Sequence, residues 1–157
     1  MSQSVTDRVS TDAGFALAEL LVVVMILSLL AALALTVFGN QRSKAEDVEA
    51  KVSAATAARA MEVCANERGG RYDSPGEPCD RTALTALEPT LAKLGTRLDD
   101  PSLGSDTYEI TVHSKRAPAE VIFTIERLSN GKMDRTCVVN GQDKGGCRNP
   151  GGPGPDW

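Results

Sequence analysis

A single carboxylate stands at the edge of a long apolar segment. Glu19 directly precedes the run from Leu20 to Phe38, which contains no charged residue. An ionised carboxylate is costly beside a hydrocarbon phase, so it needs either a water-exposed position or a cationic partner. Gly14 and Phe15 lie just upstream, after a short polar stretch. The residue types therefore point to charge pairing at a membrane edge.

The apolar run is long enough to cross a bilayer. A helix from Phe15 to Phe38 would span about 36 Å, at a rise of about 1.5 Å per residue. An ordinary secretory signal is an alternative, with a small-residue cleavage site near residues 32–34, but its apolar core is normally shorter. A simple single-pass anchor is the other alternative.

The junction Gly14-Phe15-Ala16-Leu17-Ala18-Glu19, followed by the apolar run, resembles the class III signal sequence of type IV pilins and type II secretion pseudopilins. In that family a glycine precedes phenylalanine or methionine, and a glutamate follows four residues later. The match makes residues 1–14 a leader peptide, Phe15 the first mature residue and Glu19 the glutamate of the pattern. The resemblance is specific over residues 14–38.

The resemblance implies that a prepilin peptidase cleaves after Gly14 and that Phe15 is then N-methylated. It also implies that Glu19 neutralises the terminal amine of an adjacent subunit. Such a pair lowers the cost of burying either charge, and a wrong register leaves one charge unpaired. Glu19 would thus set register during assembly. The alternative is that Glu19 only reaches the lipid headgroups.

For the whole chain, the resemblance implies a structural subunit of a type IV pilus-like extracellular filament, without catalysis or cofactor. The chain would sit in the cytoplasmic membrane as a single-pass protein before assembly, and in an extracellular pilus or fimbrium afterwards. Its partners would be copies of itself in a helical filament, the prepilin peptidase, and the assembly platform with its ATPase. A type II secretion pseudopilin, a DNA-uptake pilin and a membrane-anchored binding domain are the alternatives.

Where many members of this family carry a helix-breaking proline, the chain has Thr36. Gly39 and Asn40 follow shortly, and both are poor helix formers. We therefore expect a weak point near these three residues, where the helix unwinds locally during assembly.

Composition restricts the partners further. The formal net charge is −4 and the isoelectric point is about 5.0, so the chain has no global basic footprint for nucleic acid. A loose basic group lies near the C-terminal end and would offer a local contact to DNA or to a surface, although ordinary solvated charge explains it as well. Its members are Lys132, Arg135, Lys144 and Arg148.

Four cysteines follow the apolar run, at positions 64, 79, 137 and 147. Their spacing fits two local loops, Cys64–Cys79 and Cys137–Cys147, which is one of three possible pairings. Disulfides would indicate an oxidising compartment outside the cytoplasm. A zinc site is disfavoured because the cysteines form no CxxC pair and the only histidine, His113, is distant in sequence.

The pattern predicts an α+β fold, in which one long N-terminal helix packs on a small antiparallel sheet, as in pilins. The helix is expected from Phe15 to about Arg68, with a membrane-spanning half and an amphipathic half, and the pair Gly69-Gly70 would end it. Its amphipathic half carries an apolar stripe, and we expect an alanine-rich helix of this kind to pack closely against its neighbours. The stripe consists of Ala45, Val48, Val52, Ala55 and Ala58.

The remaining elements follow from turn residues and alternation. Pro89 is expected to start a second short helix, and Gly95 to cap its end. Asn130-Gly131 predicts a hairpin turn. The expected elements are a loop over 71–81, helix over 82–93, strands over 108–114, 121–128 and 135–139, and an irregular end over 141–157. The expected organisation is leader 1–14, assembly helix 15–40, globular head 41–144 and Gly/Pro-rich tail 145–157.

Other candidate sites are weak. His113 is expected to be an exposed strand residue. Asp134, Asn140 and Asp143 carry oxygens suited to calcium, but their spacing matches no EF-hand and turn chemistry explains them equally well. No serine or cysteine has a nearby base pattern, and no glycine-rich phosphate loop follows a strand. We therefore expect neither an enzyme nor a metal site.

Overall fold

The computed structural model describes residues 9–115, 120–140, 146–148 and 157, and for residues 9–16 and 35–40 it describes the backbone only. The chain forms two compact units, Met1–Gln41 and Arg42–Trp157. We call the second unit the head.

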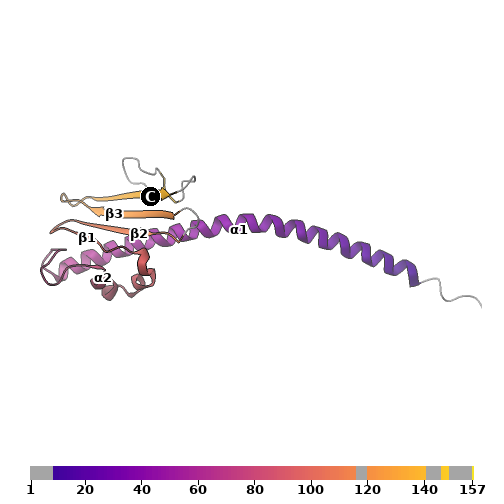
Figure 1. Cartoon of the computed structure of the whole chain (residues 1–157), viewed down its shortest axis with the longest axis horizontal. Coiled ribbons are helices and arrows are strands. Elements are labelled where there is room, and N and C mark those ends of the chain that lie inside the picture. The colour runs from indigo at the N-terminus through magenta and orange to yellow at the C-terminus, as the bar shows by residue number, and fades with distance from the viewer. Residues whose placement is uncertain (1–8, 116–119, 141–145, 149–156) are drawn as a thin grey trace, which may run out of the picture. The chain divides into compact units, whose positions relative to one another are not determined.

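Helix α1 runs from Val9 to Glu67 without a break (Figure 1). Its end agrees with the expected end to within one residue, and it passes through Thr36, Gly39 and Asn40. Its start differs, because residues 9–14 are helical, whereas a leader is expected to lack folded structure. The apolar run has strong helix formers at its start, and they extend the helix backwards into the polar stretch.

Two glycines end α1. Gly69 and Gly70 both have positive φ angles, of 70° and 87°, which residues with a β-carbon rarely adopt. The amide of Gly70 donates to the carbonyl of Ala65 at 2.7 Å, and this bond satisfies one of the last free carbonyls of the helix. The predicted stop is confirmed.

The head contains a four-stranded antiparallel sheet, in the order β1-β2-β3-β4. Buried and less buried residues alternate along β2 and β3, as expected for strands with one face on a core. The strands are β1 (Ser102–Leu103), β2 (Tyr108–His113), β3 (Glu120–Arg127) and β4 (Met133–Asn140). The α+β class and the three longer strands are confirmed, and β1 is an addition.

The hairpin between β3 and β4 forms at the predicted turn. Gly131 has a φ of 79°, and the amide of Leu128 donates to the carbonyl of Lys132 at 2.9 Å. The side chain of Asn130 accepts from the amide of Lys132, which closes the turn locally. This turn sets the register in which Phe123 pairs with Cys137.

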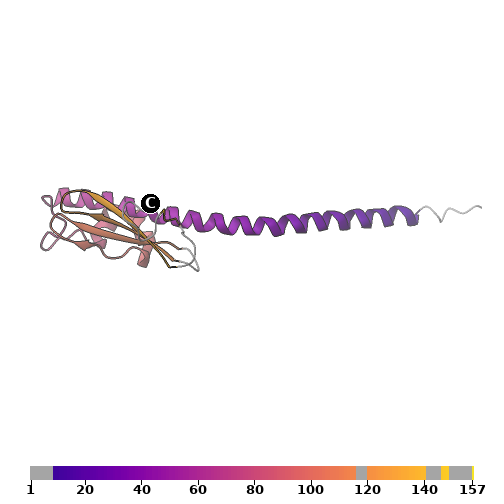
Figure 2. The same ribbon diagram turned by 90° about the horizontal axis from the view of Figure 1, so that it is seen from above.

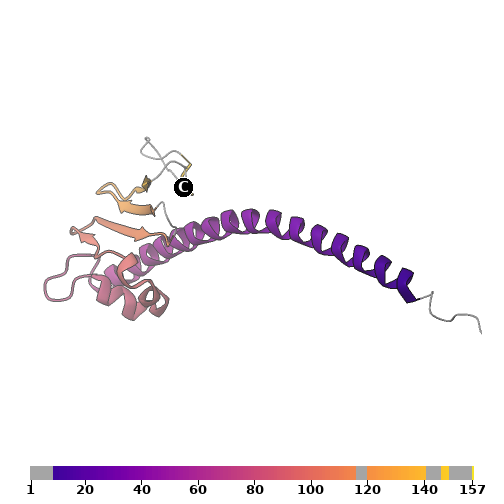
Figure 3. The same cartoon turned by 45° about the vertical axis from the view of Figure 1, so that its right-hand side comes forward.

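Two short helices connect α1 to the sheet. Helix α2 (Arg81–Leu87) is capped by Asp80, whose carboxylate accepts from the amide of Ala83 at 2.8 Å. The 3-10 helix η1 (Pro89–Arg97) begins at Pro89, as expected. Gly95 does not end η1 but forms a kink inside it, with a φ of 58°. In the head, α2 lies on one side of α1 and the strands β3 and β4 on the other (Figures 1 and 3).

The buried face of α1 coincides with the apolar stripe only in part. Ala58 is buried as expected, but Val48 and Val52 are 56% and 59% exposed. Small residues occupy the buried face instead, because a helix comes close to a neighbouring layer only where its side chains are short. Figure 2 shows the last turns of α1 running beside the strands of the head. The fully buried residues of this face are Ala50, Ala54, Ala57, Met61 and Cys64. The most hydrophobic positions of the stripe are therefore not the buried ones.

The small residues on the buried face of α1 lead to a testable prediction. Ala57 is fully buried, so Ala57→Leu has to force extra volume into the packed core of the head. We expect the head to lose about 2 kcal/mol of stability. The same change at the exposed Ala45, on the same helix, should cost under about 0.5 kcal/mol. Urea denaturation of both variants tests this, and equal losses would mean that the wrong face has been identified.

Candidate functional site

The N-terminal unit presents an apolar segment of α1 to its surroundings. Residues Leu17–Ala34 have a mean hydropathy of 2.7, and none of them is buried. As a helix they span about 27 Å, which matches the apolar thickness of a bilayer. The segment is therefore long and apolar enough to be a membrane anchor or a signal sequence.

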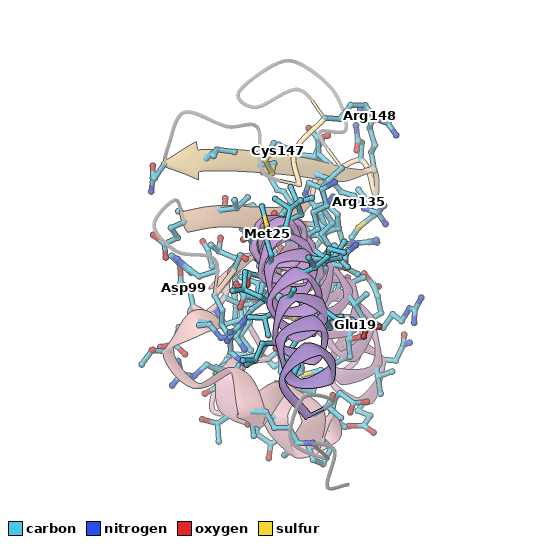
Figure 4. The ribbon with its side chains drawn as sticks, turned by 90° about the vertical axis from the view of Figure 1, so that its right-hand side faces the viewer. Glu19, Met25, Asp99, Arg135, Cys147 and Arg148 are labelled. Carbon is cyan, nitrogen blue, oxygen red and sulfur yellow. A yellow bond between two sulfur atoms is a disulfide. The ribbon has the colours of Figure 1, made fainter. Side chains whose placement is uncertain are left out.

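Glu19 lies near the start of this apolar segment and is exposed. Figure 4 shows that Glu19 and Met25 leave α1 on different sides. Gly14 and Phe15 lie on the same helix backbone, and their side chains are outside the described residues. Phe15 and Glu19 are four residues apart, which is about one turn of the helix. Cleavage after Gly14 would require local unwinding of the helix, because α1 continues through this residue.

The serine of the apolar segment forms its hydrogen bond within the helix. The hydroxyl of Ser28 donates to the carbonyl of Val24, one turn earlier. This bond leaves the surface of the segment with little demand for polar partners, which suits contact with lipid or with other apolar helices.

Both disulfides that the spacing favours are present. Cys64–Cys79 joins the last turns of α1 to the loop before α2, with a Cα–Cα distance of 5.9 Å. Cys137–Cys147 joins β4 to the segment that follows it, with a Cα–Cα distance of 5.7 Å. The guanidinium of Arg68 also donates to the carbonyl of Pro78, which closes the first loop a second time.

A buried carboxylate in the head was missed by sequence reasoning. Asp47 is only 2% exposed, and its Oδ1 accepts from the hydroxyl of Ser114 at 2.8 Å. One turn on, the ammonium of Lys51 donates to the carbonyl of Gly146 at 2.5 Å. Burial lowers the pKa of Lys51, the charge of Asp47 opposes that change, and the charge of Arg148 reinforces it. These residues join α1 to the end of β2 and to the segment after β4.

A second polar cluster lies further along α1. The carboxylate of Glu62 accepts from the hydroxyls of Tyr72 and Tyr108, at 3.0 and 3.2 Å, and forms a 3.5 Å ion pair with Arg127. Burial raises the pKa of Tyr72 to about 12, and the hydrogen bond and charge of Glu62 act in the same direction. The pKa of Tyr108 is also raised, first by burial and then by Glu62. Both phenols therefore stay protonated and donate to Glu62.

His113 is not the exposed strand residue that we expected. Its side chain is 24% exposed and lies between two carboxylates, with Nδ1 at 2.7 Å from Glu120 and Nε2 at 3.1 Å from Asp99. Burial acts to lower the pKa of His113, but the hydrogen bonds to Asp99 and Glu120 outweigh it and raise the pKa overall. Asp99 lies far from the strand in sequence, so no local pattern could have revealed this contact.

The raised pKa of His113 predicts a pH-dependent stability. The protonated imidazole is favoured in the folded state, so its contribution is complete below the ordinary value of 6.5 and is lost as pH rises through the higher folded pKa. We expect the free energy of unfolding to fall by about 0.5–1 kcal/mol over that rise. His113→Gln should remove this fall. Denaturation of both proteins on either side of neutrality measures it, and identical pH slopes would contradict it.

The distance between Asp134 and Asn140 contradicts the calcium hypothesis. Asp134 and Asn140 lie six positions apart on β4, which is about 20 Å along a strand and too far for one ion. Asp143 lies outside the described residues. In the part of the chain that the structure describes, no group of three His, Cys, Asp or Glu side chains is placed to hold a metal ion.

The basic group near the C-terminal end is only partly described. Arg135 and Arg148 appear on the same side of the head in Figure 4, and Lys144 lies outside the described residues. Trp157 packs edge-on against Phe123, with ring centroids 5.5 Å apart, and the guanidinium of Arg135 lies 5.2 Å from the indole centroid. The group therefore includes an aromatic residue that sequence analysis did not connect with it.

An apolar groove runs beside the exposed valines of α1. It lies between α1 and η1, and its volume is about 480 Å³. Val48 and Val52 line one wall, and Leu91 and Leu94 line the other. These two valines of the apolar stripe are therefore part of the surface of the head.

No family model, no curated protein and no solved structure matches this chain. The structure itself defines an α+β protein with an exposed apolar N-terminal helix, a four-stranded antiparallel sheet and two disulfides.

Proposed function

We propose that the chain is a type IV pilin-like structural subunit of an extracellular filament. A prepilin peptidase cleaves it after Gly14, the new terminus at Phe15 is N-methylated, and the mature chain polymerises through its N-terminal helix. The pairing of Glu19 with the terminal amine of a neighbouring copy sets the register. The subunit performs no catalysis.

The exposed apolar segment carries this proposal. Residues Leu17–Ala34 have no buried member, and Glu19 and the Gly14-Phe15 pair stand at their start. Apolar side chains leave water only in a membrane or against other chains. A subunit that moves from a membrane into a filament meets this requirement in both states.

The head offers further support. Val48 and Val52 leave an apolar strip of α1 exposed beside a groove of about 480 Å³. Such a strip suits lateral packing against neighbouring copies. The two disulfides suit a head that folds outside the cytoplasm.

Mass spectrometry of the chain purified from its native membrane tests the proposal. We expect a mature N-terminus at methylated Phe15, and we expect filaments sheared from the cells to contain the chain. A chain with Met1 intact, or one that begins beyond residue 30, would refute the proposal. An intact Met1 would favour a membrane-anchored binding domain, and a start beyond residue 30 would favour plain secretion.

A further inference from the structure

A second groove of the head lies between α1 and the strands β2, β3 and β4. Its volume is about 350 Å³, which is within the usual range for ligand sites of about 300–1,000 Å³. Its floor is apolar and its walls carry cations. The residues that matter here are Ala55, Ala58, Arg59, Arg127, Met133 and Arg135.

The charge of this basic groove is unbalanced. Three arginines line it against one carboxylate, that of Glu62, although the chain as a whole has a net charge of −4. Glu62 is already engaged by two tyrosine hydroxyls and by Arg127. Among the described residues, neither Arg59 nor Arg135 forms an ion pair, and the buried Nε of Arg127 has no hydrogen-bond partner. The groove therefore favours an anionic occupant.

The strand β4 favours an extended occupant. In the described part of the chain β4 pairs only with β3, so its other edge offers backbone groups for a further strand. Trp157 already uses this strand, because its indole Nε1 donates to the carbonyl of Thr136 at 2.9 Å while its ring contacts Arg135. A residue 21 positions away thus docks on β4 through a backbone hydrogen bond and an arginine contact.

We propose that the basic groove binds an extended acidic peptide segment of a partner protein. Carboxylates of the segment pair with Arg59, Arg127 and Arg135, and a small apolar side chain covers Ala55, Ala58 and Met133. The backbone of the segment bonds to the edge of β4. This binding site goes beyond the role of filament subunit and does not depend on it.

The test uses the full chain in micelles of an uncharged detergent and a labelled short peptide of alternating glutamate and leucine. We expect saturable binding by fluorescence anisotropy, and binding roughly tenfold weaker for the glutamine-leucine peptide. The double variant Arg59→Gln, Arg135→Gln should also bind the acidic peptide at least about tenfold more weakly. The control Arg42→Gln, Arg71→Gln removes the same charge outside the groove and should bind like the original protein.

A charge-reversal variant distinguishes a specific loss of binding from misfolding. The variant Arg59→Glu, Arg135→Glu should lose the acidic peptide and gain a lysine-leucine peptide, which a misfolded protein would not do. Equal binding of the acidic and neutral peptides would overturn the proposal, as would an equal loss in the control variant. Single-stranded DNA of the same charge that displaces the acidic peptide at lower concentration would also overturn it, in favour of a nucleic-acid site.

Discussion

Replacing Glu19 with glutamine is expected to abolish filament formation while the chain is still made, cleaved and folded. Glutamine keeps the size and polarity of the side chain but removes its charge. The ammonium of a neighbouring Phe15 would then enter an apolar bundle without a partner, at a cost of about 3–5 kcal/mol. Because about 1.4 kcal/mol is a factor of ten in an equilibrium constant, the yield of sheared filaments should fall at least about a hundredfold.

Two measurements distinguish a failure of assembly from a failure of cleavage. Mass spectrometry shows whether the Glu19→Gln chain is still cleaved after Gly14, and electron microscopy of the sheared fraction shows whether filaments form. Glu126→Gln is the matched control, because Glu126 is an exposed carboxylate on β3 in the head. Filaments at the normal level from a cleaved Glu19→Gln chain would show that Glu19 does not act as a charge partner.

Removing the Cys64–Cys79 disulfide should cause the largest loss of stability in the head. The bond closes a sequence separation of 15 residues, and a loop of this size restricts the unfolded chain by about 3 kcal/mol. Cys64→Ala with Cys79→Ala avoids both a free thiol and a buried hydroxyl, since both positions are fully buried. The free energy of unfolding should fall by about 3 kcal/mol.

The second disulfide provides the comparison. Cys137–Cys147 closes a separation of 10 residues, so the paired alanine variant at those positions should lose less. Urea denaturation followed by the near-ultraviolet circular dichroism of Tyr72 and Tyr108 measures both. A loss under about 0.5 kcal/mol for the Cys64 and Cys79 variant would show that the loop before α2 is held by its other contacts.

Local signals were sufficient for most elements of the head. The alternation over residues 108–113 and 120–127, the Asn130-Gly131 turn, the Gly69-Gly70 stop and Pro89 each act within a few residues. The strand β1 was missed because it has only two residues and exists by pairing with β2. Its sequence carries no periodicity to detect.

The buried face of α1 does not coincide with the apolar stripe at Val48 and Val52, for a reason that is general. Valine is more hydrophobic than alanine, so a scale based on transfer from water favours Val48 and Val52. The buried face instead requires α1 to approach the neighbouring layer closely, and the short side chains of Ala50, Ala54 and Ala57 allow this approach. Whether volume or hydrophobicity decides depends on the distance to the opposing layer, which the sequence of the helix does not contain.

The polar contacts of the head could not be predicted either. Asp47 meets Ser114 across 67 positions, and His113 meets Asp99 across 14, so each pair exists only in the folded head. The proposed processing and assembly signal is different, because Gly14, Phe15 and Glu19 lie within one short stretch. For that reason the sequence alone supports a specific hypothesis for the N-terminal segment, but only a weak hypothesis for a site in the head.

Trp157 gives this protein an optical reporter that requires no labelling. It is the only tryptophan in the chain, and its ring lies against Phe123 and Arg135 beside the basic groove. Its emission therefore reports on a single place in the head. An occupant that enters the groove next to Arg135 should change the wavelength or the collisional quenching of that emission, so docking can be followed in the unmodified molecule.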